Sequence, residues 1–329
     1  MAIIDKPSDF FNTKLTTGTG NSQAVTGLGF QPDWIWGKRR DDTGNNSLFD
    51  SVRGITKGLE SNGQGAEFTS SDYYTAFGND GFTIAAGSGG AGNGNGQTAV
   101  QWCWKAGGSA SSNSNGSITS SVSANTDAGF SIVSYTGNGS DNATIGHGLG
   151  SSINFVIVKR RNSTSNWLVQ GSKVGTGYGQ YLELNATSAV TSASDNIKSV
   201  SSSLLTLGTN GSCNGSSDTY IAYCFSEVSN YSKMESYTGN GNADGPFVYT
   251  GFKPAFLLVK RSSQANNDWN LHDNKSPGFN VNNSYSAPLL FALKCLLTSL
   301  NVFLLLSDIC QLLSAPVDFT ITNAGLNPV

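Results

Sequence analysis

Residues 133–161 read VSYTGNGSDNATIGHGLGSSINFVIVKRR, and the same pattern occurs twice more in the chain. Residues 234–261 read MESYTGNGNADGPFVYTGFKPAFLLVKR, and residues 15–40 read LTTGTGNSQAVTGLGFQPDWIWGKRR. Each copy has a glycine turn, a short apolar stretch, a loop glycine and an apolar run that ends in a Lys–Arg pair. Such self-similarity predicts a repeat architecture. It also disfavours an ordinary enzyme, since catalytic groups rarely occur in triplicate.

The spacing of the copies sets the size of the repeating unit. Between the lysines of the basic pairs, Lys38, Lys159 and Lys260, the copies lie roughly 120 and 100 residues apart, which is a common domain size. We therefore expect tandem domains, each with its own hydrophobic core, and not a solenoid whose units depend on their neighbours. The predicted boundaries are 1–107 for repeat 1, 108–126 for a Gly/Ser/Asn-rich linker, 127–229 for repeat 2 and 230–329 for repeat 3. Because no comparable linker separates repeats 2 and 3, we expect these two to pack closely, with repeat 1 set apart.

Short apolar or alternating runs, bounded by Gly, Asn and Ser, indicate β-strands along most of the chain. Turn signals recur about every 8–12 residues, and this spacing favours β-sandwich or jelly-roll units. In repeat 2 the expected strands are 130–135, 143–145, 155–158, 167–170, 181–184, 204–207 and 220–228. The predicted fold class is all-β, with tandem sandwich repeats of jelly-roll or concanavalin-like type and an atypical Leu-rich C-terminal segment.

The composition limits the kinds of partner. Of 329 residues only 12% are charged, against a usual fraction of roughly 25%, and the formal net charge is −3. A surface built of Ser, Thr, Asn and Gly is typical of extracellular and virion β-proteins. The charge gives no electrostatic attraction to nucleic acid or to an acidic membrane, so we expect neither partner.

No residue pattern points to catalysis, a metal or a cofactor. The five cysteines include no CxxC pair, and His147, in a GHGLG turn, has no second ligand at metal-site spacing. The carboxylates are isolated, whereas glycosidases need two of them held at a fixed distance. We expect Cys103 and Cys224, which occupy equivalent places in two repeats, to be buried thiols without a bridge between them.

Two sets of side chains remain as candidates for contacts. The Lys–Arg pairs could meet carboxylated sugars or an acidic subunit surface, but solvated ends of buried strands that limit edge aggregation explain them better. Trp34 and Trp36 lie two residues apart and point to one sheet face, where core packing and a sugar-stacking platform are the alternatives. We name four tryptophans as candidate carbohydrate or subunit contacts: Trp34, Trp36, Trp167 and Trp269.

The C-terminal part departs from the repeat pattern. Residues 289–313 read LLFALKCLLTSLNVFLLLSDICQLL, which favours a helix where repeat 3 should supply a counterpart of residues 220–228. A natural helix, a pair of core strands, an element of a subunit interface and the product of a frameshift are the alternatives. Lys294 and Asp308 would be costly inside a bilayer, so membrane insertion is not expected. We expect the segment to be buried against repeat 3 or at a subunit interface.

Several phrases of the sequence resemble a known family. They are MAIIDKPSDFFNTKL (1–15), LFDSVRG (48–54), NDGFTI (79–84), QWCWKAGG (101–108), YIAYCFSEV (220–228) and SYTGNGNADGPFVYTGFKPAF (236–256). They are similar to signatures of repeated modules in virion structural proteins of marine bacteriophages, above all cyanobacterial and SAR11-type phages. The resemblance covers about residues 1–285. It implies lectin-like sandwich modules of the tail-fibre type.

These features predict a non-enzymatic protein of the virion that acts as a tail fibre or receptor-binding appendage on host-surface glycan. A capsid decoration or head-fibre protein and a polysaccharide depolymerase are the alternatives. The expected partners are other virion subunits, host-surface polysaccharide and further copies of the chain. A trimer is favoured, because tail fibres are usually trimers.

Overall fold

The protein is almost entirely β. The computed structural model describes residues 4–87, 90–242, 245–276 and 300–307, the last stretch by its backbone alone. Strands hold 43% and helix 1% of these described residues, the helix being η1 (Pro7–Asp9). The strands form several antiparallel sheets, which confirms the all-β, sandwich-type fold predicted from the alternating apolar runs.

Repeat 1 consists of one large and one small sheet. The large sheet has the order β1 (Phe11–Thr17), β9 (Thr98–Trp104), β3 (Trp34–Arg39), β4 (Asn46–Asp50), β5 (Lys57–Glu60) and β6 (Phe68–Thr69). The small sheet has the order β2 (Gln23–Val25), β8 (Gly81–Ile84) and β7 (Tyr74–Gly78). A cluster that includes Ile35, Phe49, Tyr74 and Phe82 fills the space between the two sheets.

Repeat 2 has the same arrangement. Its large sheet has the order β10 (Ser111–Asn113), β11 (Ser120–Asn125), β12 (Phe130–Thr136), β20 (Thr219–Phe225), β14 (Phe155–Arg160), β15 (Leu168–Gly171), β16 (Gln180–Glu183) and β17 (Thr191–Ser192). Its small sheet has the order β13 (Ala143–Gly146), β19 (Leu204–Leu207) and β18 (Ile197–Val200). The segment 108–126, predicted as a linker, carries β10 and β11, which extend this large sheet beyond β12.

Repeat 3 contributes a four-stranded sheet with the order β21 (Ser232–Thr238), β24 (Leu300–Ser307), β22 (Pro254–Arg261) and β23 (Trp269–Asp273). Strand β24 comes from the Leu-rich segment 289–313, so the helix considered for that segment is wrong for residues 300–307. Its backbone pairs with both β21 and β22, as expected for a segment packed on repeat 3. The rest of the Leu-rich segment lies outside the described residues.

The three Lys–Arg strands occupy equivalent positions, as predicted. β3 lies between β9 and β4, β14 between β20 and β15, and β22 between β24 and β23. The loop glycines that precede these strands, Gly29, Gly150 and Gly251, all have a left-handed backbone, with φ of 87°, 69° and 83°. This conformation is costly for any residue with a Cβ, which explains why glycine recurs there.

The large sheets are buried on both faces, because alternate residues enter two different cores. On β14, Phe155 and Ile157 point to a central cluster, while Val156 and Val158 point to the small sheet of the same repeat. Side chains on successive strand positions face opposite sides, so a strand covered on both sides reads as a continuous apolar run. This is why residues 155–158 (FVIV), 256–259 (FLLV) and 34–36 (WIW) do not alternate between apolar and polar side chains.

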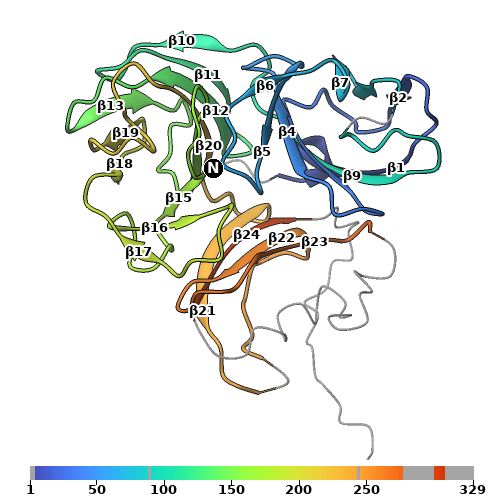
Figure 1. Ribbon diagram of the computed structural model, residues 1–329. Helices are drawn as coiled ribbons and strands as arrows, with labels where there is room; N and C mark the ends of the chain where they lie inside the picture. The colour runs from blue at the N-terminus through green and yellow to red at the C-terminus, as the bar shows by residue number, and fades with distance from the viewer. Residues whose placement is uncertain (1–3, 88–89, 243–244, 277–299, 308–329) are drawn as a thin grey trace, which may run out of the picture.

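The central cluster joins all three repeats. Its members include Trp34, Trp36, Trp102, Trp104, Phe130, Phe155, Tyr223, Phe225, Phe256 and Leu258. Figure 1 shows the repeats as three lobes, repeat 1 at the right, repeat 2 at the left and repeat 3 below. The cluster takes its members from the large sheets of all three. The expectation that repeat 1 is set apart is therefore wrong, and the repeats share a core in addition to their own.

Candidate functional site

Two of the four candidate tryptophans lie in the central cluster. Trp34 is 0% exposed and Trp36 is 4% exposed. The Trp34 ring stacks on Tyr223 of repeat 2, with centroids 4.3 Å apart and an interplanar angle of 17°. Of the two alternatives for this pair, the structure shows core packing, because a sugar platform needs an exposed ring face.

The other two candidate tryptophans join neighbouring repeats. The indole N–H of Trp167 in repeat 2 donates to the Glu60 carbonyl of repeat 1 at 2.9 Å. The indole N–H of Trp269 in repeat 3 donates to the Glu183 carbonyl of repeat 2, also at 2.9 Å. Glu60 and Glu183 occupy equivalent places on β5 and β16. The two tryptophans thus make the same contact at successive boundaries inside one chain.

Two lysines of the Lys–Arg pairs also make contacts between neighbouring repeats. For these two, the expected role as solvated strand ends is wrong. Lys159 and Lys260 are both 0% exposed. The Lys159 ammonium donates to the Gln64 carbonyl of repeat 1 at 3.2 Å, and the Lys260 ammonium donates to the Thr187 carbonyl of repeat 2 at 3.5 Å. Lys38 instead donates to carbonyls of its own loop, at Asp42 and Gly44.

Burial changes the acidity of these ammonium groups. It lowers the pKa of Lys159 to about 8, and the charge of Arg160 acts in the same direction. Burial also lowers the pKa of Lys260, partly offset by the charge of Asp268. A lysine held this way adds a hydrogen bond across the boundary between repeats, to a carbonyl group that also accepts from a backbone N–H: Gln64 from Ser165, and Thr187 from Asn267.

A buried charged network crosses the boundary between repeats 1 and 2. The Arg53 side chain is fully buried, forms an ion pair with Asp50, and donates to the Tyr223 hydroxyl oxygen of repeat 2 at 3.3 Å. The Tyr223 hydroxyl donates to Asp50 at 2.8 Å. Glu67 completes the network by accepting from Arg161 of repeat 2 at 2.8 Å. Burial raises the pKa of Glu67, but hydrogen bonds from Arg161 and the charge of Arg53 outweigh it and hold that pKa below its usual value.

One hydrogen bond of this network has a counterpart at the boundary between repeats 1 and 3. Trp102 on β9 occupies the place of Tyr223 on β20, and Asp273 on β23 occupies that of Asp50 on β4. The Trp102 indole N–H donates to Asp273 at 3.1 Å. Phe256 of repeat 3 also meets the ring of Trp104, at 5.3 Å between centroids. Each repeat therefore contacts both others, and the three boundaries close a ring around the central cluster.

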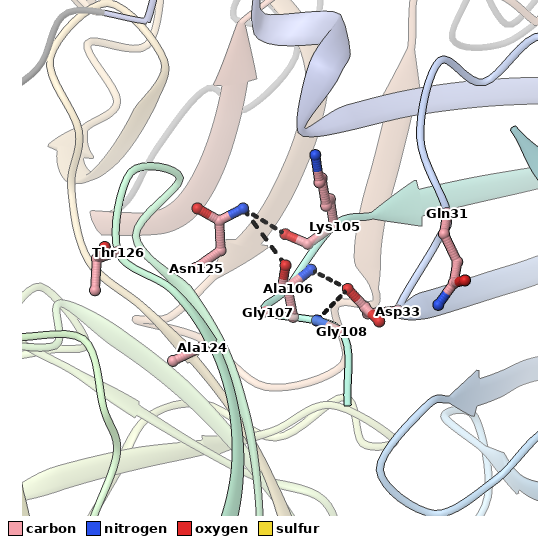
Figure 2. A pocket seen from close by; sticks show the side chains of 9 residues that line it. All are labelled: Gln31, Asp33, Lys105, Ala106, Gly107, Gly108, Ala124, Asn125 and Thr126. Atoms are coloured by element: carbon pink, nitrogen blue, oxygen red, sulfur yellow. Dashed lines mark hydrogen bonds between the residues drawn. The ribbon is translucent and has the colours of Figure 1, made fainter. Parts of the chain in front are cut away.

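A hollow of about 410 Å³ lies where repeat 1 leads into the segment before repeat 2. Its lining residues are Gln31, Asp33, Lys105, Ala106, Gly107, Gly108, Ala124, Asn125 and Thr126. Figure 2 shows Asp33 and Asn125 holding the backbone of residues 105–108 from opposite sides. The Asp33 carboxylate accepts from the backbone N–H of Ala106 at 2.8 Å and of Gly108 at 3.2 Å. Burial raises its pKa, against the opposing effect of these hydrogen bonds.

Comparison of repeats 1 and 2 shows that Asp33 has a structural role. Asn154, its counterpart in repeat 2, accepts from the backbone N–H of Glu227 at 2.9 Å, just after β20, as Asp33 accepts from Ala106 just after β9. The backbone N–H groups of Asp33 and Asn154 also donate to the last residue of those strands, each at 2.8 Å. Since both repeats use this contact, the hollow's buried carboxylate serves the fold and is no specific sign of a ligand.

Two large apolar side chains are mainly exposed in the described part of the chain. Phe247 is 88% exposed and Tyr249 is 77% exposed. Both lie between β21 and β22, in the copy of the repeated phrase that belongs to repeat 3. Val248, between them, packs against the cluster of Tyr237, Leu257 and Val259. The inward valine and the two exposed rings show that both rings project away from the repeat.

The remaining candidates for chemistry are buried. Cys103 and Cys224 are buried free thiols, as predicted, and Cys213 is a third. His147 is buried, and its ring contacts the Ser201 carbonyl and the Leu149 backbone N–H. Among the described residues no group of three or more His, Cys, Asp or Glu could hold a metal ion. Within the same residues no helix is long and apolar enough to cross a membrane.

The fold and its boundaries define a triplicated all-β protein whose repeats close on one core. The chain belongs to a family defined as a domain of unknown function, DUF7483, whose family model matches residues 6–290. No curated protein and no solved structure matches the chain.

The roles of several structurally important residues could not be predicted from the sequence of a single repeat. Asp50 and Arg53 lie in the phrase LFDSVRG, but neither their pairing nor their contact with Tyr223 follows from spacing along the chain. Phe247 and Tyr249 could have been found by comparing copies, since the inward Val25 of repeat 1 has the small neighbours Ala24 and Thr26. The four tryptophans were found, but their solvent exposure was not predictable from alternation alone.

Proposed function

We propose that this chain is a non-enzymatic structural protein of a bacteriophage virion, a tail fibre or receptor-binding appendage that contacts host-surface glycan. The resemblance of its repeated phrases to marine phage modules supports the virion setting. Its partners are then other virion subunits, host polysaccharide and further copies of the chain, with a trimer favoured. It works on the outside of the particle, as a scaffold that presents loops.

The observation that carries this proposal is the single aromatic core shared by three sandwich repeats. An appendage that meets a cell surface needs a body that does not flex when its loops are loaded. Buried boundaries supply this stiffness, because separating repeats 1 and 2 would expose Trp34 and Tyr223 to water and break the hydrogen bond between Arg53 and Tyr223. A surface with few charges, made of Ser, Thr, Asn and Gly, suits a partner rich in hydroxyl groups.

The experiment is quantitative mass spectrometry of purified virions from the phage that carries this gene. A tail fibre or receptor-binding appendage is expected at a low multiple of three or six copies per particle. Hundreds of copies would instead assign the protein to capsid decoration. Absence from intact virions, with the protein present in the infected cell, would refute the virion role.

Enzymatic action needs a separate assay. Purified protein incubated with host-surface polysaccharide should release no new reducing ends, since the role proposed here is contact without cleavage. Release that a single Asp or Glu substitution abolishes would identify a depolymerase instead.

A further inference from the structure

The exposed pair Phe247 and Tyr249 stands apart from the rest of the described surface. Solvent-exposed aromatic side chains of this size carry a cost in water and commonly mark contacts. The stretch between β21 and β22 runs at the periphery of repeat 3, away from the other two lobes (Figure 1). The pair therefore takes no part in the contacts between repeats that hold the fold together.

Comparison of the three copies shows that folding does not require these rings. Val248 and Val25 of repeat 1 are both inward apolar residues between the glycine turn and the loop glycine of their repeat, although Val25 lies four residues before Gly29 and Val248 three before Gly251. The residues on either side of Val25 are Ala24 and Thr26, and both are exposed although the small sheet of repeat 1 is complete. The fold thus leaves these two positions in water, where small residues suffice.

In repeat 2 the inward residue of the corresponding strand, β13, is Ile145. The chain segment before β11 lies along it. Ile118 forms a bridge with Ile145, and the backbone N–H of Ser117 donates to the Thr144 hydroxyl at 2.8 Å. The inward residue of repeat 2 is thus covered by a further segment of the chain. In repeat 3 the inward Val248 is flanked by two exposed aromatic rings.

We propose that Phe247 and Tyr249 form a stacking platform for the pyranose rings of a neutral polysaccharide. This rests on the proposed function and specifies where glycan contact occurs. The C–H faces of a sugar ring pack against an aromatic face, and the Tyr249 hydroxyl can exchange hydrogen bonds with sugar hydroxyls. The tryptophans first named for this role lie in the core or at the boundaries between repeats, so the platform falls on different residues.

Size and charge favour a sugar over a protein as the occupant. Two aromatic side chains offer roughly 150–250 Å² each, well below the roughly 800 Å² per partner of a stable protein interface. Rings two residues apart on an extended chain lie about 7 Å apart, which suits one or two sugar units. Residues 245–252 contain no charged side chain, so a neutral glycan meets no unpaired charge there.

The test uses the full chain on an array of neutral and acidic bacterial polysaccharides, followed by calorimetric titration of the strongest binder. The double variant Phe247→Ser/Tyr249→Ser removes both rings. The matched control, Ala24→Ser/Thr26→Ser, changes the two exposed residues on either side of the inward Val25 of repeat 1. Circular dichroism and sedimentation establish that all three proteins fold and show their state of association.

We expect the wild-type chain to bind a neutral polysaccharide, the double variant to bind it at least about tenfold more weakly, and the control to bind as the wild type does. Equal binding by wild type and double variant would overturn the platform. So would a wild-type chain that binds no glycan, whereas the virion count tests the structural role independently. Self-association that only the double variant loses would show that the rings contact protein instead.

Discussion

Arg53 is a fully buried guanidinium that meets two carboxylates and a phenol at the boundary between repeats 1 and 2. At the next boundary, between repeats 2 and 3, the counterparts of Arg53 and Glu67 are Val174 and Val190, both in contact with the central cluster. Because equivalent positions hold an ion network at one boundary and valines at the next, charged side chains are not required to fill this part of a boundary. A buried ion pair is costly to desolvate, and here its polar atoms also bond to the Tyr223 hydroxyl, which is the contact that crosses to repeat 2.

Substitution of Asp50 by Asn should destabilise the protein by about 3–5 kcal/mol, because it leaves the Arg53 charge poorly compensated in the interior. Urea unfolding followed by tryptophan fluorescence measures the loss. The double variant Asp50→Leu/Arg53→Met, which copies the apolar character of the other boundary, should recover most of it. A loss below about 1 kcal/mol for the single variant would show that the network is weakly coupled to folding.

Lys159 predicts a specific dependence of stability on pH. Its pKa in the folded protein is about 8, below the ordinary value of 10.5, chiefly because of burial. Between these two pH values the unfolded chain binds more protons than the folded one, so this group makes stability rise with pH. The free energy of unfolding of the wild type, relative to that of Lys159→Met, should increase by about 2 kcal/mol from pH 8 to pH 10.

Comparing the two proteins cancels the opposite contribution of the buried tyrosines and cysteines, whose raised pKa values make stability fall in the same range. Urea titrations of both proteins at matched pH values give the difference. A difference that stays constant over this range would mean that Lys159 keeps an ordinary pKa in the folded state.

At the scale of elements, sequence predicted the strands of repeat 2 well. The expected runs 143–145, 155–158 and 204–207 coincide with β13, β14 and β19 within two residues at each end. For the Leu-rich segment the sequence favoured a helix, because leucine is a good helix former. Its position in the sheet requires a strand instead. β24 takes the central place that β9 and β20 take in the other large sheets, so the sheet's hydrogen-bond pattern outweighs the local preference.

The role of β24 can be tested with proline. Residue 303 pairs with both Glu235 on β21 and Val259 on β22, so its substitution Phe303→Pro interrupts a ladder in the middle of a sheet. We expect this variant to be insoluble or to lose its cooperative unfolding, whereas Ser307→Pro, at the last residue of β24, should be tolerated. Soluble, normally folded Phe303→Pro protein would show that repeat 3 does not need this pairing.

The candidate site was less predictable than the strands, for a physical reason. Alternation shows that Trp34 and Trp36 share a face, but not whether that face meets water or another sheet. That distinction depends on how separate repeats pack, which involves residues such as Tyr223 far along the chain. By contrast, Phe247 and Tyr249 stand on either side of an inward valine, as Ala24 and Thr26 do in repeat 1, where both are exposed.

At the scale of the whole molecule, three repeats depend on one core. Trp34 contacts Tyr223 of repeat 2, and Trp104 contacts Phe256 of repeat 3. Removing one repeat would expose aromatic surface on both others. This differs from tandem domains that fold independently, each around its own interior.

We expect the chain to unfold in a single cooperative transition, with equal calorimetric and van't Hoff enthalpies. The reason is that no repeat can open without exposing the shared cluster. Residues 108–229 expressed alone, which contain all strands of repeat 2, should be insoluble or only partly folded. Separate transitions for the full chain, or a stable isolated repeat 2, would show that the central cluster contributes little.

The closed ring of boundaries has a consequence for how such a gene can change. Open repeat arrays gain and lose copies by recombination, because each new copy needs only its neighbour. Here a lost copy would deprive Asp273 of Trp102 or Arg53 of Tyr223, and a fourth copy would have no place around the centre. The number three is therefore fixed once the ring has closed. Sequence change is then expected in the outward loops, where the exposed neighbours of an inward valine are Ala24 and Thr26 in one copy and Phe247 and Tyr249 in another.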